Sequence, residues 1–100
     1  MVKLIVELSG GLELLFGHVK QFNVDVPQPR EGEALIMRDV LAWIRATLLQ
    51  ERPELFMTGD SIRPGILVLI NDADWELEGT NSYKPKDGDV IAFISTLHGG

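Results

Sequence analysis

With 100 residues, of which 45% are hydrophobic and 24% charged, the chain can form one folded domain but not two, and it has no apolar run that could span a membrane. Its net charge of −6 argues against direct nucleic-acid binding and favours basic surfaces on protein partners. Because the chain has no cysteine, it holds no disulfide, no cysteine-rich zinc site and no side-chain thioester or persulfide.

The N-terminal residues predict a strand. Charges at Lys3 and Glu7 come too early for a signal peptide, so we expect a protein of the cytosol, or also of the nucleus. Residues 3–8 alternate with the period of a half-buried strand, with Lys3, Ile5 and Glu7 on the outward face. The apolar face of this strand consists of Leu4, Val6 and Leu8.

A second strand is predicted to pair with the first as a hairpin. Residues 9–11 contain two glycines, which supply the positive φ of a tight turn. The apolar pattern resumes at residues 12–16, and a clean alternation follows at 21–26. We therefore expect the second arm of the hairpin to be interrupted near Gly17 and to end at Pro27.

Residues 35–50 change to a helical period. Glu33 lies near the expected start, where negative charge suits the helix dipole, and Pro53 is expected to close the element. In so small a domain the apolar stripe is predicted to be core and not a partner-binding face, with Trp43 packed at its edge. The stripe consists of Met37, Val40, Leu41, Ile44 and Leu48.

Residues 54–64 form a connection whose apolar side chains are expected to pack under the domain; these are Leu55, Phe56 and Met57. The unbroken apolar run 65–70 follows, bounded by turn residues. Such a run predicts either a strand buried on both faces or a strand whose second face awaits a partner.

The acidic stretch 71–74 predicts a turn and not a calcium site, because it lacks the glycine and the terminal glutamate of an EF-hand loop. His18, with no second ligand at metal-binding spacing, is predicted to be a solvated loop residue. Residues 75–77 are expected to begin a short strand, 84–89 a tight turn, and 90–94 the last strand.

The order of elements is hairpin, helix, strand, short strand, strand and tail. We predict an α+β protein of the β-grasp, ubiquitin-like class: a mixed sheet with one main helix packed across it and an extended C-terminal tail. The first and last strands are expected to be neighbours, the strand order being taken by analogy. The domain is expected to span residues 1–94, followed by a flexible diglycine tail, 95–100.

The tail ends in Gly99 and Gly100 directly after an apolar strand. Glycine has no Cβ, so a diglycine end can pass through a channel too narrow for other residues. We expect it to enter another protein's active site, where its carboxylate reacts. A frayed end or a cloning scar is the alternative, since two terminal glycines arise by chance in roughly one chain in two hundred.

The sequence resembles the eukaryotic ubiquitin-related modifier family, which combines the β-grasp with a C-terminal Leu-His-Gly-Gly. Segments 51–56, 63–77 and 94–100 carry the resemblance, which covers essentially the whole chain and is weakest at 28–35. The long central segment is specific to that family. The diglycine alone is not, because other ubiquitin-like modifiers and sulfur carriers share it.

The resemblance implies a sulfur carrier that is not an enzyme and binds no cofactor. An activating adenylyltransferase/sulfurtransferase would use ATP and Mg²⁺ to convert the Gly100 carboxylate into an acyl-adenylate and then a thiocarboxylate. A tRNA thiolase complex would pass the sulfur to the wobble uridine of cytosolic tRNAs. Gly100 would also be joined to lysines of target proteins by an isopeptide bond (urmylation), and the carrier would be a monomer.

Four tail residues are therefore predicted to be recognised by the activating enzyme: Leu97, His98, Gly99 and Gly100. A side chain at position 99 would clash in the channel, while for His98 a solvated position is an equal alternative. The sequence does not decide which surface docks the enzyme, and the segment 66–70 is the candidate. It is also open whether one of the chain's own lysines is an acceptor; these are Lys3, Lys20, Lys84 and Lys86.

Two other functions stay open at this point. One is a sulfur carrier for molybdopterin-type cofactor synthesis, and the other is a β-grasp interaction module that undergoes no reaction. The segment 63–77 favours the carrier for tRNA thiolation over the cofactor carrier.

Overall fold

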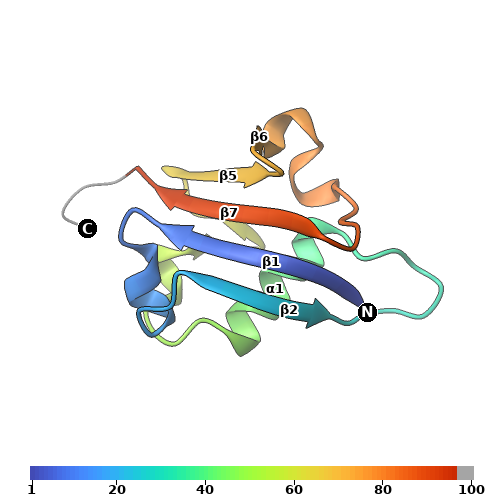
Figure 1. Cartoon of the computed structure of the whole chain (residues 1–100), viewed down its shortest axis with the longest axis horizontal. Coiled ribbons are helices and arrows are strands. Elements are labelled where there is room, and N and C mark those ends of the chain that lie inside the picture. Colours follow the sequence, from blue (N-terminus) through green and yellow to red (C-terminus); the bar gives the residue numbers. More distant parts are fainter. Residues whose placement is uncertain (97–100) are drawn as a thin grey trace.

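The computed structural model describes residues 1–96, which form a five-stranded mixed sheet with one α-helix across one face (Figure 1). The strand order is β2-β1-β7-β5-β6. β1 and β7 pair in parallel, and the other neighbours are antiparallel. The sheet consists of β1 (Val2–Ser9), β2 (Gln21–Val26), β5 (Ile66–Ile70), β6 (Ala73–Asp74) and β7 (Asp89–Ser95).

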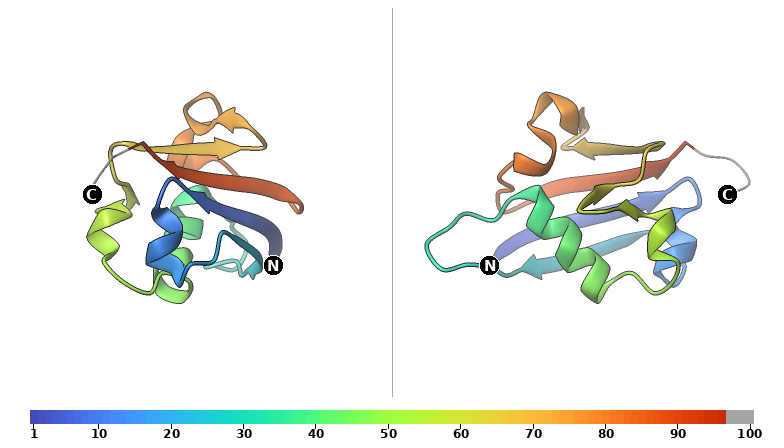
Figure 2. Two further views of the ribbon diagram at one scale, coloured as in Figure 1. Left: turned by 60° about the vertical axis from the view of Figure 1, so that its left-hand side comes forward. Right: turned by 180° about the vertical axis from the view of Figure 1, so that it is seen from behind.

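The first and last strands are direct neighbours, as predicted. β7 lies between β1 and β5, so both edges of the last strand are hydrogen-bonded within the sheet. The helix α1 (Met37–Thr47) covers one face, which Figure 2 shows from behind. The connection between α1 and β5 contains a small separate hairpin, β3 (Met57–Thr58) and β4 (Ser61–Ile62).

The core lies between the sheet and α1. The inward face of β1 is fully buried, as its alternation predicts, and so is the apolar stripe of α1 except for Leu48, which is partly buried. A chain of edge-to-face aromatic contacts crosses this core, with ring centroids 6.2 Å apart for Phe16–Phe22, 5.3 Å for Phe16–Phe56 and 5.2 Å for Phe56–Phe93. The prediction that the connection 54–64 packs under the domain is confirmed by Phe56, which is 0% exposed.

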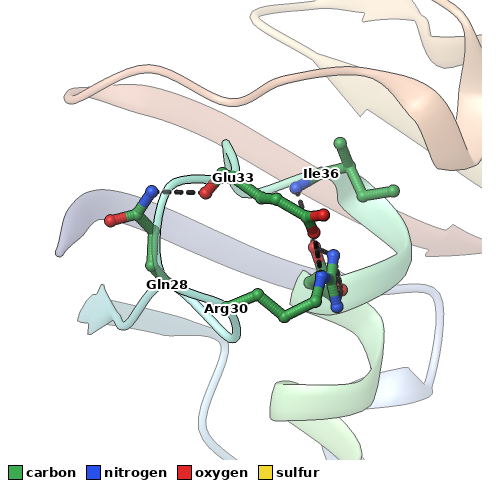
Figure 3. Close-up of polar contacts among 5 residues, drawn as sticks. Gln28, Arg30, Glu33 and Ile36 are labelled. Carbon is green, nitrogen blue, oxygen red and sulfur yellow. Dashed lines mark hydrogen bonds and ion pairs between the residues drawn. The ribbon is translucent and has the colours of Figure 1, made fainter.

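The helix is shorter than the predicted 35–50. Its start is fixed by Asp39, whose carboxylate accepts a hydrogen bond from the Ile36 N–H at 3.1 Å. Glu33, the acid expected there, lies before the helix and pairs with Arg30, and its carbonyl accepts from Gln28 (Figure 3). At the other end the helix stops at Thr47, well before the proline expected to close it.

No helix within the described residues is long and apolar enough to cross a bilayer.

Two segments predicted to be extended are 3₁₀ helices. Leu12–Phe16 is one, bracketed by Gly11 and Gly17 with φ of 100° and 70°. Its buried residues are Leu12, Leu15 and Phe16, and the first two are three apart, which is the repeat of a 3₁₀ turn. The second arm of the hairpin is therefore β2 alone. Trp75–Leu77 is the other, begun by Asp74, whose carboxylate accepts from the Glu76 N–H at 2.9 Å.

The remaining turn and strand predictions are resolved by backbone geometry. Asn71 and Asp72 have φ of 50° and 69° and join β5 to β6 as a two-residue hairpin, which confirms the predicted turn. Within residues 1–96 no group of three or more His, Asp or Glu side chains could hold a metal ion. β5 is not buried on both faces, because Leu67 and Leu69 stay partly exposed.

A buried carboxylate that sequence reasoning missed fixes the start of β7. Asp89 accepts hydrogen bonds from the Tyr83 hydroxyl at 2.6 Å, the Asn71 side-chain amide at 2.9 Å and the Lys86 N–H at 2.9 Å. Burial alone would raise the pKa of Asp89, but these three donors lower it below its usual value. Burial and the same carboxylate raise the pKa of Tyr83 to about 12. The cluster ties the turn before β7 to the β5–β6 hairpin.

Candidate functional site

The four residues predicted to react or to be recognised, Leu97, His98, Gly99 and Gly100, lie outside the described residues. What the structure presents is the point from which they leave the domain. The division of the chain into a domain 1–94 and a tail 95–100 stays a prediction. Ser95 is the last residue of β7, and Thr96 is the last described residue.

The base of the tail is held by backbone contacts from two sides. Ser95 pairs with Ile66 of β5, and the preceding residue, Ile94, pairs with Ser9 of β1. The Thr96 N–H donates to the Gly65 carbonyl at 3.0 Å, and the Thr96 hydroxyl donates to the same oxygen. The chain is therefore fixed in position up to Thr96, four residues before the terminal carboxylate.

The turn after β1 packs directly on this base. A Cβ at Gly10 would lie 2.4 Å from the Ser95 carbonyl oxygen, a distance that real Cβ atoms do not adopt. Gly10 also has a φ of +70°, which L side chains rarely adopt. The glycine that the sequence predicts as a turn former thus has a second role, since it allows the β1 turn to contact the end of β7.

Replacing Gly10 with alanine is expected to destabilise the domain by about 2–4 kcal/mol, from the left-handed φ and the clash with Ser95. Gly59→Ala is the matched control, because Gly59 has a φ of +61° and no atom near its would-be Cβ. The control should lower the free energy of unfolding by about 1 kcal/mol. Urea unfolding of both variants measures the difference, and equal losses would show that the contact with Ser95 does not constrain the fold.

The sheet face opposite α1 is open and partly apolar. Its central residues are partly exposed side chains of three strands, namely Ile5, Leu67, Leu69, Val90, Ala92 and Ile94. Of the predicted docking segment 66–70, only Leu67 and Leu69 lie on this face, because Ile66, Val68 and Ile70 point into the core.

Nothing in the described part of the chain forms a catalytic arrangement. His18, predicted to be a loop residue, is exposed in a turn with φ of 65°. The buried acid Asp89 accepts three hydrogen bonds within the fold and lies at the opposite end of β7 from Ser95. What the site provides is a rigid support for a chain end.

The comparisons with known proteins agree with one another. The family model described as Urm1 (Ubiquitin related modifier) matches residues 3–100. A ubiquitin-related modifier 1 homologue of Chlamydomonas reinhardtii is 59% identical over 100 residues and covers 100% of both chains. The ubiquitin-related modifier 1 of Homo sapiens is 57% identical over 95 residues, which are 95% of this chain and 92% of that one.

A solved structure has the same fold. The solution structure of Urm1 from Trypanosoma brucei superposes with a TM-score of 0.80 at 38% identity, covering 98% of this chain and 95% of that one. The predicted β-grasp, ubiquitin-like fold is thereby confirmed.

Proposed function

This chain belongs to the Urm1 (ubiquitin related modifier) family, and we propose that its function depends on the terminal carboxylate of Gly100. The family predicted from the sequence is confirmed. The chain is a sulfur carrier for tRNA thiolation and a protein modifier; it is not itself catalytic and binds no cofactor. The family match over residues 3–100, which includes the diglycine, is the observation that carries the proposal.

The proposed chemistry takes place on the terminal glycine. An oxygen of the Gly100 carboxylate attacks the α-phosphorus of ATP, pyrophosphate leaves, and an acyl-adenylate forms. A carboxylate is a poor electrophile, and the anhydride with AMP supplies the leaving group that it lacks. A persulfide on the activating enzyme then displaces AMP, and cleavage of its sulfur–sulfur bond by a thiol leaves a thiocarboxylate. The phosphoryl step depends on positioning and on Mg²⁺, both supplied by the enzyme.

Three residues before Gly100 are proposed to guide the tail into that enzyme. Gly99 keeps the chain slim enough for the channel, while Leu97 and His98 contact the enzyme. The support for this proposal is the geometry before the tail, where the Thr96 N–H donates to the Gly65 carbonyl and fixes the point from which these residues continue.

The family implies interaction with an E1-like activating enzyme. We propose that this enzyme combines adenylyltransferase and sulfurtransferase activities and docks on the open sheet face through Leu67 and Leu69. We also propose that a tRNA thiolase takes up the sulfur in the cytosol and that Gly100 is joined to lysines of target proteins. The net charge of −6 supports a division of labour in which the thiolase, and not this chain, contacts tRNA.

The test is reconstitution of the full chain with its activating enzyme, ATP, Mg²⁺ and a sulfur source, followed by intact mass spectrometry. We expect a product in which one oxygen of the C-terminal carboxyl group is replaced by sulfur. An unchanged mass would instead favour an interaction module that undergoes no reaction. Loss of wobble-uridine thiolation in a deletion strain separates this function from a carrier for molybdopterin-type cofactors.

A further inference from the structure

A pocket of about 480 Å³ opens beside the base of the tail. Its floor is apolar and comes from the two segments that contact the core as 3₁₀ turns, namely Leu12, Leu14, Leu15 and Leu55. Gly10, Gly11 and Ser95 complete one wall. Leu14 is 53% exposed, so its side chain offers apolar surface at the pocket.

Two arginines stand at the rim of this pocket, Arg52 and Arg63. Of the chain's five arginines, Arg30 and Arg38 form ion pairs within residues 1–96, whereas neither rim arginine pairs with any described acid. Glu51 also lines the pocket, so the rim carries two positive charges and one negative charge. The chain as a whole has a net charge of −6, so this pocket is locally positive on an otherwise acidic protein.

We propose that this pocket binds an acidic, apolar segment of the activating enzyme, which inserts a bulky apolar side chain over Leu14 and places a neighbouring carboxylate on Arg52 and Arg63. The inference rests on the proposed function and adds to it a second contact, separate from the sheet face. Charge complementarity selects this occupant, because a basic segment would be repelled by two guanidinium groups that have no ion pair within residues 1–96, and a purely apolar segment would leave both groups desolvated.

The position of the pocket explains why an enzyme would use it. Ser95 belongs both to the pocket wall and to the end of β7, and Gly10 of the same wall contacts the Ser95 carbonyl directly. A segment bound there therefore lies against the backbone from which residues 97–100 depart. Binding at this point would restrict the directions in which the tail can extend. Such a restriction speeds the reaction because it holds the reacting carboxylate closer to the required geometry.

The test is the KM and kcat of the full chain as a substrate in adenylation by its activating enzyme, measured at two salt concentrations. We expect the Arg52→Gln/Arg63→Gln double variant to raise KM about 10-fold at low salt with kcat nearly unchanged. The wild-type KM should rise with salt and that of the double variant should rise less, because the ion pairs are already lost. Leu14→Ser should raise KM at both salt concentrations.

Arg45→Gln is the matched control, since Arg45 is exposed on α1, has no ion pair within residues 1–96 and lies outside the pocket. It removes one positive charge where the double variant removes two, so a general electrostatic effect would raise the KM of the control by about the square root of the factor seen for the double variant. Thermal melts of all variants should match wild type. If the double variant and the control have equal KM values and salt dependence while wild type is adenylated normally, the pocket proposal fails and the proposed function stands; no adenylation of wild type would refute the proposed function itself.

Discussion

Deleting Gly100 is expected to abolish thiocarboxylate formation and lysine conjugation while leaving the thermal melt of the domain unchanged. The deletion moves the terminal carboxylate to Gly99 and shortens the reach from Thr96 by one residue, about 3.3–3.6 Å. A misplacement of 1 Å can cost about 10²-fold in rate, so a shift of a whole residue removes the carboxylate from the enzyme's phosphorus-attack geometry. Intact mass spectrometry after reconstitution measures the product.

The stability half of this prediction follows from the base of the tail. The chain is anchored by hydrogen bonds from Thr96 to Gly65, and the deletion leaves this anchor and the aromatic core untouched. Gly99→Ala serves as a second variant, which keeps the length and adds only a methyl group; it should retain a small fraction of the product. If the deletion variant formed the thiocarboxylate as wild type does, Gly100 would not be the reacting residue. A lower melting temperature would show that the tail is structural.

The parts of the fold that the sequence predicts correctly are those where a single burial pattern decides the structure. In β1 the inward side chains Leu4, Val6 and Leu8 alternate with outward ones that are less buried, and in α1 the buried residues repeat at helical spacing. In both cases the apolar face has only one partner, which is the opposite layer of the core. The parallel pairing of β1 and β7 required analogy, because nothing local encodes which strands become neighbours.

The mistaken parts are short apolar segments whose period is ambiguous. Leu12–Phe16 has apolar residues at almost every position, so it fits a strand as well as a 3₁₀ turn, and the left-handed glycines at each end decide the outcome. The helix α1 begins later than predicted because Asp39, inside the apolar-periodic stretch, accepts the Ile36 N–H. Such side-chain contacts to the backbone depend on local geometry that composition does not reveal.

The candidate site divides in the same way. The proposed reacting end, Gly99 and Gly100, can be predicted from the sequence because its chemistry is local. The pocket beside Ser95 cannot be predicted, since Leu14, Arg52 and Arg63 are brought together by three separate segments. The one available signal is that Arg52 and Arg63 lie in two of the three stretches that resemble the family, where they flank the connection that folds under the domain.

Phe56→Ala is expected to be the most destabilising single substitution of the connection between α1 and β5. Phe56 is 0% exposed and makes edge contacts with both Phe16 and Phe93, so truncation leaves a cavity and removes two aromatic pairs. We expect a loss of about 3–5 kcal/mol, which lowers the melting temperature by roughly 15–30 °C in a domain of this size. Urea unfolding at constant m-value is the measurement.

Two further substitutions give this prediction its controls. Leu77→Ala removes a leucine that is 81% exposed and should change stability by about 0.5 kcal/mol or less, whereas Phe56→Leu keeps an apolar side chain and should lose about half as much as alanine. Because the Phe56 carbonyl accepts the Arg63 N–H at 2.9 Å, the cavity should also loosen the rim of the pocket. Phe56→Ala is therefore expected to raise the KM for adenylation at a temperature where the domain is still folded, and an unchanged KM would show that pocket and core are independent.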